Sequence, residues 1–231
     1  DAENARLIRP DISDDCAVFF TFAEIVMQGI RRGKVSWGEA VVIFGMGILG
    51  QMTARFCRLC GAKPVFAVEV DPVRLAKLPK DIGIIPVNPQ TEDLPGIVKE
   101  KTKGRLADVV YEVTGVAELI PDEFEVLHHQ GRFVVLSSPR GKTLFDFHDL
   151  CNWPSHTIIG AHNYAHPKFE SPDNPWTNQR DAEYFFDMIA DNEVELESLI
   201  STRIHYSDAV DYYYKLLQNR SGEMGIVIEW A

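Results

Sequence analysis

Three glycines with the spacing of a phosphate-binding turn are the residues with the clearest chemical meaning. They lie in the run GMGILG at residues 45–50, as Gly45, Gly47 and Gly50. In such a turn the first glycine permits a sharp bend, and the second lets a diphosphate approach the backbone with no Cβ in the way. The third lets a helix pack closely on the preceding strand. Because a purely structural turn can carry the same glycines, the interpretation depends on the elements around them.

The segments around the glycines have the order strand, turn, helix and strand. Residues 41–44 are fully apolar, as expected for a strand that is buried on both faces of a sheet. Apolar residues then recur at three- and four-residue spacing over 48–60, which predicts a helix that ends at Gly61. Residues 64–70 are the next predicted strand. A helix that begins at the turn directs its free N–H groups towards an anion, so this context favours a dinucleotide-phosphate site.

Two carboxylates follow the second predicted strand, at Glu69 and Asp71. A carboxylate at this place accepts hydrogen bonds from ribose hydroxyls and repels a 2′-phosphate, so it favours NAD over NADP. Both residues lie roughly 20 positions after Gly50, so the spacing does not choose between them. Asp71 precedes Pro72 and is explained as a helix N-cap, whereas Glu69 has no comparable structural role in the sequence. We therefore predict that Glu69 binds the ribose.

Strand-like and helix-like stretches continue to alternate beyond this point, which requires crossover connections and predicts a parallel sheet with helices on both faces. Counting 41–44 and 64–70, six strands are expected, as in a complete dinucleotide-binding sheet. The fold class is thus α/β, a doubly wound six-stranded parallel sheet of the Rossmann type. The further predicted elements are strands at 84–87, 108–113, 132–137 and 157–160, and helices at 94–103 and 117–129.

The composition changes at residues 167–176, which contain three prolines and are predicted to form a loop or linker. The tail beyond it does not fit the six-stranded sheet, so it is expected to belong to a second unit. Its predicted elements are helices at 177–192 and from Ser207 to near Asn219, and strands at 199–204 and 226–230.

Charge and composition narrow the classes of partner. The chain of 231 residues has a net charge of −11 with scattered basic residues, a field that repels nucleic acid and anionic membranes. No apolar run is long enough to span a membrane, and the acidic N-terminal stretch has no signal-peptide core. The four cysteines show no disulfide framework. We expect a cytoplasmic protein with a small-molecule substrate, no nucleic-acid partner and no membrane partner.

Cysteine and histidine pairs are the other candidates for chemistry. Cys57 and Cys60 have the spacing of half a metal site or a redox pair, but they lie in the predicted helix after the glycine turn, where core packing is the favoured explanation. His162 and His166 are four residues apart, as in a helical metal site. They follow a strand and precede Pro167, so a metal site there is disfavoured.

A third histidine pair, His128-His129, is predicted to close the helix over 117–129, where a cation suits the helix dipole.

Taken in order, these segments resemble the medium-chain, zinc-type alcohol dehydrogenase superfamily over most of the chain. The order and spacing of the pieces carry the resemblance rather than any single piece. The pieces are GIRR at 29–32, WGE at 37–39, GMGILG at 45–50, FAVEVDPVRL at 66–75, ADVVYEVTG at 107–115, HHQGRFVVLSS at 128–138 and LISTRIHYSDAVDYYYKLLQ at 199–218.

The resemblance implies a split domain organisation. Residues 1–32 would be the exit segment of a catalytic domain, 33–166 the NAD-binding Rossmann domain, and 167–231 the return segment, a partial remnant of the catalytic domain. The family's zinc ligands and proton relay would then lie upstream of Asp1, so no metal ligand is assigned in this chain, although the resemblance allows zinc in the whole protein. The family's members are typically dimers or tetramers, so a homodimer or homotetramer is expected.

Two positions depart from the family pattern. Where many zinc enzymes have a fourth zinc ligand, this chain has Phe20 or Thr21, neither a good ligand for zinc. Where some members place a basic residue towards the diphosphate, it has Met224-Gly225.

The resemblance also assigns cofactor-binding positions. Arg74 would lie against the adenosine ribose, Val113 and Thr114 would pass the nicotinamide ribose, and the turn at 136–138 would hold the nicotinamide. His162 is the one candidate catalytic residue, because a histidine beside the nicotinamide could relay a proton near neutral pH. The complete set is Gly45, Gly47, Ile48, Leu49, Gly50, Glu69, Val70, Arg74, Val113, Thr114, Leu136, Ser137, Ser138, Ala161, His162 and Asn163.

Three functions are consistent with these residues. The favoured one is an NAD-dependent oxidoreductase that transfers a hydride between nicotinamide and an alcohol, polyol or carbonyl substrate. The second is a catalytically incomplete dinucleotide-binding module without turnover. The third is a methyltransferase, which also places a glycine-rich turn before an acidic strand end, but the sixth strand and the tail argue against it.

Overall fold

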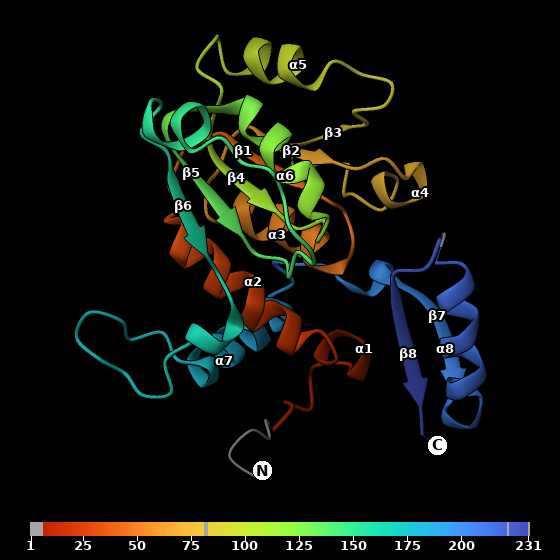
Figure 1. Ribbon diagram of the computed structural model, residues 1–231. Helices are drawn as coiled ribbons and strands as arrows, with labels where there is room; N and C mark the ends of the chain where they lie inside the picture. The colour runs from red at the N-terminus through yellow and green to blue at the C-terminus, as the bar shows by residue number, and fades with distance from the viewer. Residues whose placement is uncertain (1–6, 81–82, 221, 231) are drawn as a thin grey trace.

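A computed structural model of the chain describes residues 7–80, 83–220 and 222–230. Its centre is a six-stranded sheet in the order β3-β2-β1-β4-β5-β6, and all of its strand pairs are parallel (Figure 1). This confirms the predicted Rossmann-type α/β fold and its number of strands. The strands are β1 (Val41–Phe44), β2 (Val65–Val68), β3 (Ile84–Val87), β4 (Ala107–Glu112), β5 (Leu127–Val135) and β6 (Thr157–Gly160).

Helices cover both faces of the sheet, and successive residues of its inner strands are buried against opposite faces. On one face Ile43 and Tyr111 pack with α2 (Phe20–Gly33), α3 (Ile48–Leu59) and α7 (Asn178–Ala190). On the other, Val42 and Val110 pack with α5 (Leu94–Lys101) and with the segment that contains α6 (Ile120–Glu123). Because successive strand side chains point to opposite faces, the continuous apolar runs supply two cores at once.

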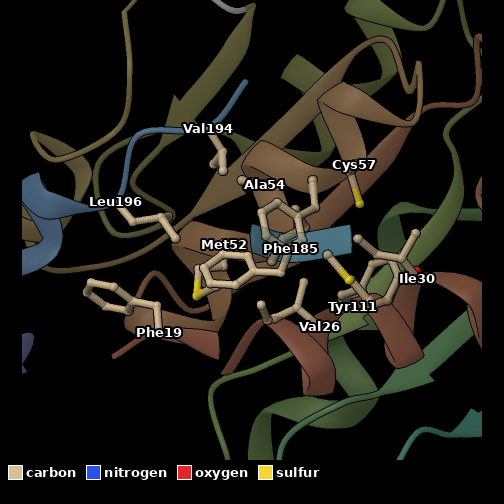
Figure 2. Packing of buried hydrophobic residues seen from close by; sticks show 14 of the residues in the cluster. Phe19, Val26, Ile30, Met52, Ala54, Cys57, Tyr111, Phe185, Val194 and Leu196 are labelled. Atoms are coloured by element: carbon tan, nitrogen blue, oxygen red, sulfur yellow. The ribbon is translucent and has the colours of Figure 1, made fainter. Parts of the chain in front are cut away.

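The first of these cores brings together segments from both ends of the chain. Figure 2 shows Val26 and Ile30 of α2, Met52 and Cys57 of α3, and Phe185 of α7 around a common centre. The segment assigned to residues 1–32 and the segment after residue 167 therefore share one hydrophobic cluster with the sheet. The first six residues of the N-terminal segment lie outside the described part of the chain, and the division into 1–32, 33–166 and 167–231 stays a prediction.

Two glycines bring α2 directly onto the sheet. A Cβ at Gly29 would lie 2.6 Å from Leu136 Cδ1, and one at Gly33 would lie 2.3 Å from the Tyr111 hydroxyl. Since any larger residue would overlap these atoms, the helix contacts the sheet through bare backbone at both places. Tyr111 donates a hydrogen bond to the Gly29 carbonyl at 3.3 Å, which ties the helix to β4.

Only the last part of the tail, from β7 onwards, forms a separate small sheet, whereas α7 packs with α2 in the core of the six-stranded sheet. Strand β7 (Ile200–His205), helix α8 (Ala209–Gln218) and strand β8 (Gly225–Glu229) make a two-stranded parallel sheet with its own connecting helix. Figure 1 shows this unit to one side of the six-stranded sheet. The remaining elements are short: α1 (Asp14–Ala17), α4 (Pro72–Leu75), the 3-10 turns Ala117–Leu119, Phe124–Val126, Asn163–Ala165, Glu197–Leu199 and Tyr206–Asp208, and a π-helical turn, His148–Asn152.

The predicted helix over 117–129 is wrong. Only short helical turns are present before Leu127, where β5 already begins and pairs with Ala107 of β4. His128 therefore lies in a strand and not at a helix end, and its Nε2 lies 3.0 Å from Asp108 Oδ1. Burial of Val126 and Leu127 against the sheet outweighs the helical spacing of the apolar residues in this stretch.

Within the described ranges, none of the helices has both the length and the apolar character needed to cross a bilayer.

Candidate functional site

The glycine turn connects β1 to α3 at the carboxyl end of the sheet. Gly45 has a φ of 93°, and a Cβ there would lie 3.0 Å from the Thr114 backbone nitrogen. A Cβ at Gly50 would lie 1.8 Å from the Gly45 carbonyl oxygen. Both positions therefore require glycine, the first for its backbone conformation and the second for close packing of helix and strand, as predicted.

Gly47 has a different environment, because a Cβ there would have no atom within 4 Å. It is the N-cap of α3 and provides no side-chain hydrogen bond to the helix. The first amides of a helix lack intrahelical acceptors, and Ile48, Leu49 and Gly50, the first residues of α3, line one cleft together with Gly47. An anion can approach this backbone without a steric barrier, and the residues present fit a diphosphate.

Glu69 follows β2 and is 8% exposed. One carboxylate oxygen accepts hydrogen bonds from the backbone N–H groups of Val70 (2.8 Å) and Asp71 (3.1 Å). The other accepts one from the backbone N–H of Met46, inside the glycine turn, at 3.0 Å. The expectation that Glu69 lacks a structural role is therefore wrong, since its side chain joins the end of β2 to the turn. Its assignment as the ribose ligand stays a prediction.

Arg74 lies beside this carboxylate, on α4. Its Nη1 is 3.4 Å from Glu69 Oε2 and its Nε is 3.9 Å from Asp71 Oδ2. Asp71 accepts a hydrogen bond from the Val73 N–H at 2.8 Å, so the predicted N-cap role is confirmed. Gln51 of α3 donates a hydrogen bond to the Arg74 carbonyl at 2.7 Å, which holds α4 against α3.

A cleft of about 470 Å³ lies between the glycine turn and the tail unit. Six of the predicted residues line its sheet side: Gly47, Ile48, Leu49, Gly50, Arg74 and Val113. Seven residues of the tail line the other side, and none of them was predicted: Tyr213, Leu216, Leu217, Arg220, Glu223, Met224 and Ile226. The sequence pattern predicts the tail elements but carries no signal that places α8 and β8 opposite the glycine turn.

The predicted residues after β4 and β5 meet at one buried carboxylate, Glu112. It accepts hydrogen bonds from the Thr114 hydroxyl at 2.7 Å, from the Gly115 N–H at 2.8 Å, and from the Ser137 hydroxyl. Sequence reasoning missed Glu112, because an acidic residue at the end of an apolar run gives no sign of such a network. The carboxylate thus connects the segment predicted to pass the nicotinamide ribose with the turn predicted to hold the nicotinamide.

The side chains of the turn at 136–138 differ in exposure. Leu136 is buried against α2, and Ser138 is exposed.

A second buried carboxyl group, Glu123, lies near Glu112. It is 2% exposed, and neither of its oxygens has a hydrogen-bond partner among the described residues. Burial, and then the negative charges of Glu112 and Asp122, raise the pKa of Glu123 from its usual range near 4.5 to about 9. The group therefore carries a proton at neutral pH.

The segment after β6 separates the two histidines that were considered as a pair. His162 is exposed, and its Nδ1 accepts a hydrogen bond from the Tyr164 N–H at 3.0 Å. His166 is buried, with its Nε2 2.9 Å from Asp181 Oδ2, and Arg31 of α2 forms a salt bridge of 2.7 Å to the same carboxylate. His166 thus connects this segment to α2 and α7. Nowhere in the described ranges do three or more His, Cys, Asp or Glu side chains gather as a metal site would require.

The two cysteines of α3 and its C-cap have different environments. Cys57 is fully buried in the core, as predicted, and burial raises the pKa of its thiol well above the usual value. Cys60 is exposed, so its assignment to the core is wrong. The helix turns Cys60 outwards next to a small pocket lined by Arg31 and Trp176, among other residues.

Comparison with known proteins agrees with this geometry. The sequence model of the family described as "Zinc-binding dehydrogenase" matches residues 49–177. The chain is 33% identical over 238 residues to an L-threonine 3-dehydrogenase of Shewanella woodyi, which covers 99% of the chain and 62% of that protein. It is 27% identical over 206 residues to a 2-dehydro-3-deoxy-L-galactonate 5-dehydrogenase of Pseudoalteromonas atlantica, covering 88% of the chain and 55% of that protein.

Solved structures share the fold. An Escherichia coli alcohol dehydrogenase complexed with NADH superposes with a TM-score of 0.81 at 15% identity, covering 99% of this chain and 63% of that one. A zinc-binding dehydrogenase of Sinorhizobium meliloti bound to NADP superposes with a TM-score of 0.77 at 23% identity, covering 96% of this chain and 61% of that one.

The fold and the glycine turn together place the chain in the class of Rossmann-fold proteins that bind dinucleotides. The chain belongs to the zinc-binding dehydrogenase family, within the medium-chain alcohol dehydrogenase superfamily, as the resemblance implied. It spans 55% and 62% of the lengths of the two relatives above.

Proposed function

We propose that the chain is the dinucleotide-binding part of an NAD-dependent oxidoreductase, which transfers a hydride between the nicotinamide and an alcohol, polyol or carbonyl substrate. The observation that carries the proposal is the open start of α3. Gly47 leaves its Cβ position empty, and the first amides of α3 have no acceptor in the helix. A helix of 12 residues thus presents uncompensated N–H groups to a cleft, beside a carboxylate at the end of the next strand.

Glu69 is the proposed ribose ligand. A carboxylate offers about four lone-pair sites, and three of those on Glu69 accept backbone N–H groups. The fourth faces Arg74 at 3.4 Å, a long contact that a ribose hydroxyl could replace. Because the backbone donors hold the carboxylate in place, a 2′-phosphate would meet a fixed negative charge, which favours NAD over NADP.

The nicotinamide end is proposed to lie over the turns joined by Glu112. When bound, the nicotinamide would supply the hydride chemistry. The turn that contains Thr114 and the turn that contains Ser137 would fix the position of its ring, because both donate to one buried carboxylate. His162 is exposed at the end of β6, where its imidazole could exchange a proton with the substrate oxygen or with water.

The relatives support the reaction class. The two relatives are named as dehydrogenases of L-threonine and of 2-dehydro-3-deoxy-L-galactonate, and because both compounds carry hydroxyl groups, these names support an alcohol or polyol as substrate. The structural neighbours bound to NADH and to NADP agree with a nicotinamide cofactor. By the same analogy we propose a cytoplasmic homodimer or homotetramer, with zinc, where present, held by residues outside this chain.

Calorimetric titration with NADH and NADPH tests the assignment. The chain is expected to bind NADH at least about tenfold more tightly than NADPH, because a buried acid accepts from the ribose and repels the extra phosphate. Glu69→Gln should narrow this difference, whereas Glu100→Gln, on the exposed face of α5, should leave it unchanged. Equal affinities, or tighter binding of NADPH, would contradict the role of Glu69.

A turnover assay separates the alternatives. With NAD and a panel of alcohols and polyols, an oxidoreductase produces absorbance at the band of the reduced cofactor. Saturable NADH binding without any absorbance change would favour the catalytically incomplete module. Displacement of NADH by S-adenosylmethionine would favour the methyltransferase.

A further inference from the structure

The short turn after β6 carries the candidate catalytic histidine. Residues Asn163–Ala165 form a 3-10 turn, and His162 is its N-cap. The His162 Nδ1 accepts a hydrogen bond from the Tyr164 N–H at 3.0 Å, and the His162 carbonyl accepts one from the Ala165 N–H at 3.0 Å. An accepting nitrogen carries no proton, so in the neutral ring the proton lies on Nε2. The turn therefore decides which ring nitrogen of His162 is left to face outwards.

A buried histidine closes the same turn at its other end. The backbone N–H of His166 donates to the Asn163 carbonyl at 3.0 Å, and its Nδ1 lies 3.2 Å from Asn163 Oδ1. Its Nε2 lies 2.9 Å from Asp181 Oδ2, in the first turn of α7. The side chain of His166 is only 1% exposed, so the ring reaches from the turn into the core and has a partner at both nitrogens.

Asp181 has little freedom to move. It is fully buried, and its other oxygen forms a salt bridge of 2.7 Å to Arg31 of α2. The Arg31 guanidinium also stacks on Trp176, with its Cζ 3.4 Å from the ring centroid. Displacement of the carboxylate would leave a buried charge unpaired, which is strongly unfavourable. His166 is therefore bound to an anchor that two helices hold in place.

The start of the segment is held by the same helix. Arg32, the next residue of α2, donates from its Nε to the carbonyl of Gly160, the last residue of β6, at 2.7 Å. Residues 160–166 are thus connected to α2 at one end directly and at the other through His166 and Asp181. Without the imidazole of His166, the turn would keep its link to α2 at Gly160 and lose its link to α7.

We infer that His166 is a positioning residue, which holds the turn against α7 so that the imidazole of His162 keeps one orientation beside the nicotinamide. The inference rests on the proposed function and deepens it by naming a residue that acts through His162. A turn that is not held in advance must be ordered when the cofactor binds, and ordering of the backbone opposes binding. Only the nicotinamide half of the cofactor should feel this cost, because the adenosine half is proposed to bind at the glycine turn and Glu69.

Titrations of two variants with NADH and ADP test the inference. His166→Leu removes both ring contacts and should weaken NADH about tenfold while leaving ADP unchanged, since ADP lacks the nicotinamide. The fluorescence of bound NADH, which depends on the surroundings of the reduced ring, should shift towards that of free NADH. His166→Gln should restore most of both signals, because its amide can still donate to Asp181.

Nitrogen-15 NMR of the histidine rings in the cofactor-free chain tests the orientation directly. At mildly alkaline pH the unaltered chain should show His162 as a single tautomer with its proton on Nε2, whereas His166→Leu should show a mixture of the two tautomers. Asn163→Ala is the second variant, since Asn163 is only half-buried and its loss removes the contact at His166 Nδ1 alone. It should shift the His162 tautomers in the same direction, and it decides the question if His166→Leu does not fold.

His156→Leu is the matched control. His156 precedes β6, at the opposite end of that strand, and its ring also connects two segments: Nδ1 lies 2.8 Å from the Leu150 carbonyl and Nε2 lies 3.1 Å from the His128 carbonyl. Its loss should alter neither the NADH affinity nor the tautomer of His162, even where it lowers stability.

The outcomes separate this inference from the proposed function. If His166→Leu binds NADH as tightly as the unaltered chain, or if neither His166→Leu nor Asn163→Ala changes the His162 tautomer, the inference is overturned while the proposed function stands. An equal loss of ADP binding would also overturn it, because the effect would then not be confined to the nicotinamide half. If the unaltered chain binds neither NADH nor ADP, the proposed function fails, and the NMR spectra still show whether His166 orders the turn.

Discussion

The protonated Glu123 should make the stability of this chain fall as the pH rises. The perturbation is Glu123→Gln, which keeps the shape of the side chain and removes its ionisation. In the folded protein the pKa of Glu123 is raised to about 9, first by burial and then by Glu112 and Asp122, whereas the unfolded chain has its usual value near 4.5. Below pH 4.5 both states bind the proton, so the group then has no effect on the pH dependence.

Between these two values the unfolded state loses the proton and the folded state keeps it. The folded state then binds more protons, so the free energy of unfolding decreases with rising pH, by about 1.4 kcal/mol for each unit. At pH 7 the accumulated destabilisation is on the order of 3 kcal/mol, and the decrease stops near the folded pKa, which is about 9. Glu123→Gln removes this contribution, so its stability relative to the unaltered protein should improve by about 3 kcal/mol from pH 4.5 to pH 7.

Urea unfolding at several pH values measures this difference directly. The slope against urea should be the same in both proteins, so that the midpoints report stability alone. Glu125→Gln is the control, since Glu125 is an exposed carboxylate two residues away and should follow the unaltered protein at every pH. Parallel stability curves for the unaltered protein and Glu123→Gln from pH 4.5 to pH 8 would refute the argument that Glu123 is buried as a neutral acid.

Three further substitutions test separate features. Gly47→Ala should leave the free energy of unfolding nearly unchanged in a thermal unfolding experiment, because the added Cβ would meet no atom within 4 Å. The same substitution should weaken NADH binding at least about tenfold in a calorimetric titration, because the Cβ would block the diphosphate. Gly50→Ala should instead destabilise the fold by roughly 3 kcal/mol or more in a urea titration, since its Cβ would lie 1.8 Å from the Gly45 oxygen. Asp181→Asn should cost about 3 kcal/mol, because the fully buried Asp181 neutralises Arg31 and contacts His166; an unchanged urea midpoint would contradict this.

The parallel sheet was predictable because most of its strands contain a short apolar run bounded by turn residues, a pattern that depends little on which helices pack against it. The structure of residues 117–129 was not predictable in this way, because Val126 and Leu127 fit both a helical and a strand spacing. Only the partner strand decides between the two, and Ala107 pairs with Leu127 in the folded chain. Local pattern therefore identifies elements that are buried on both sides, and fails where the choice depends on a distant neighbour.

The candidate site also has one part that could be predicted from the sequence and another that could not. The glycine turn could be read from its residues, since each glycine has a local steric reason. The hydrogen bond from the Met46 amide to Glu69 joins residues 23 positions apart, and the cleft that Gly47 shares with tail residues such as Met224 depends on where β7, α8 and β8 lie. Such long-range contacts leave no periodic trace, which is why Glu112 and the tail residues of the cleft were missed.

The glycine contacts of α2 bear on how a shorter chain would behave. Gly29 and Gly33 have no side chains to separate the helix from Leu136 and Tyr111, so the helix packs directly against the sheet and belongs to the same core. A chain shortened to begin at residue 34 would lack α2, which covers part of one face of the sheet. The newly bared aromatic and aliphatic surface would promote aggregation. Engineering a minimal coenzyme-binding unit from this protein therefore requires retention of the helix at its amino-terminal side.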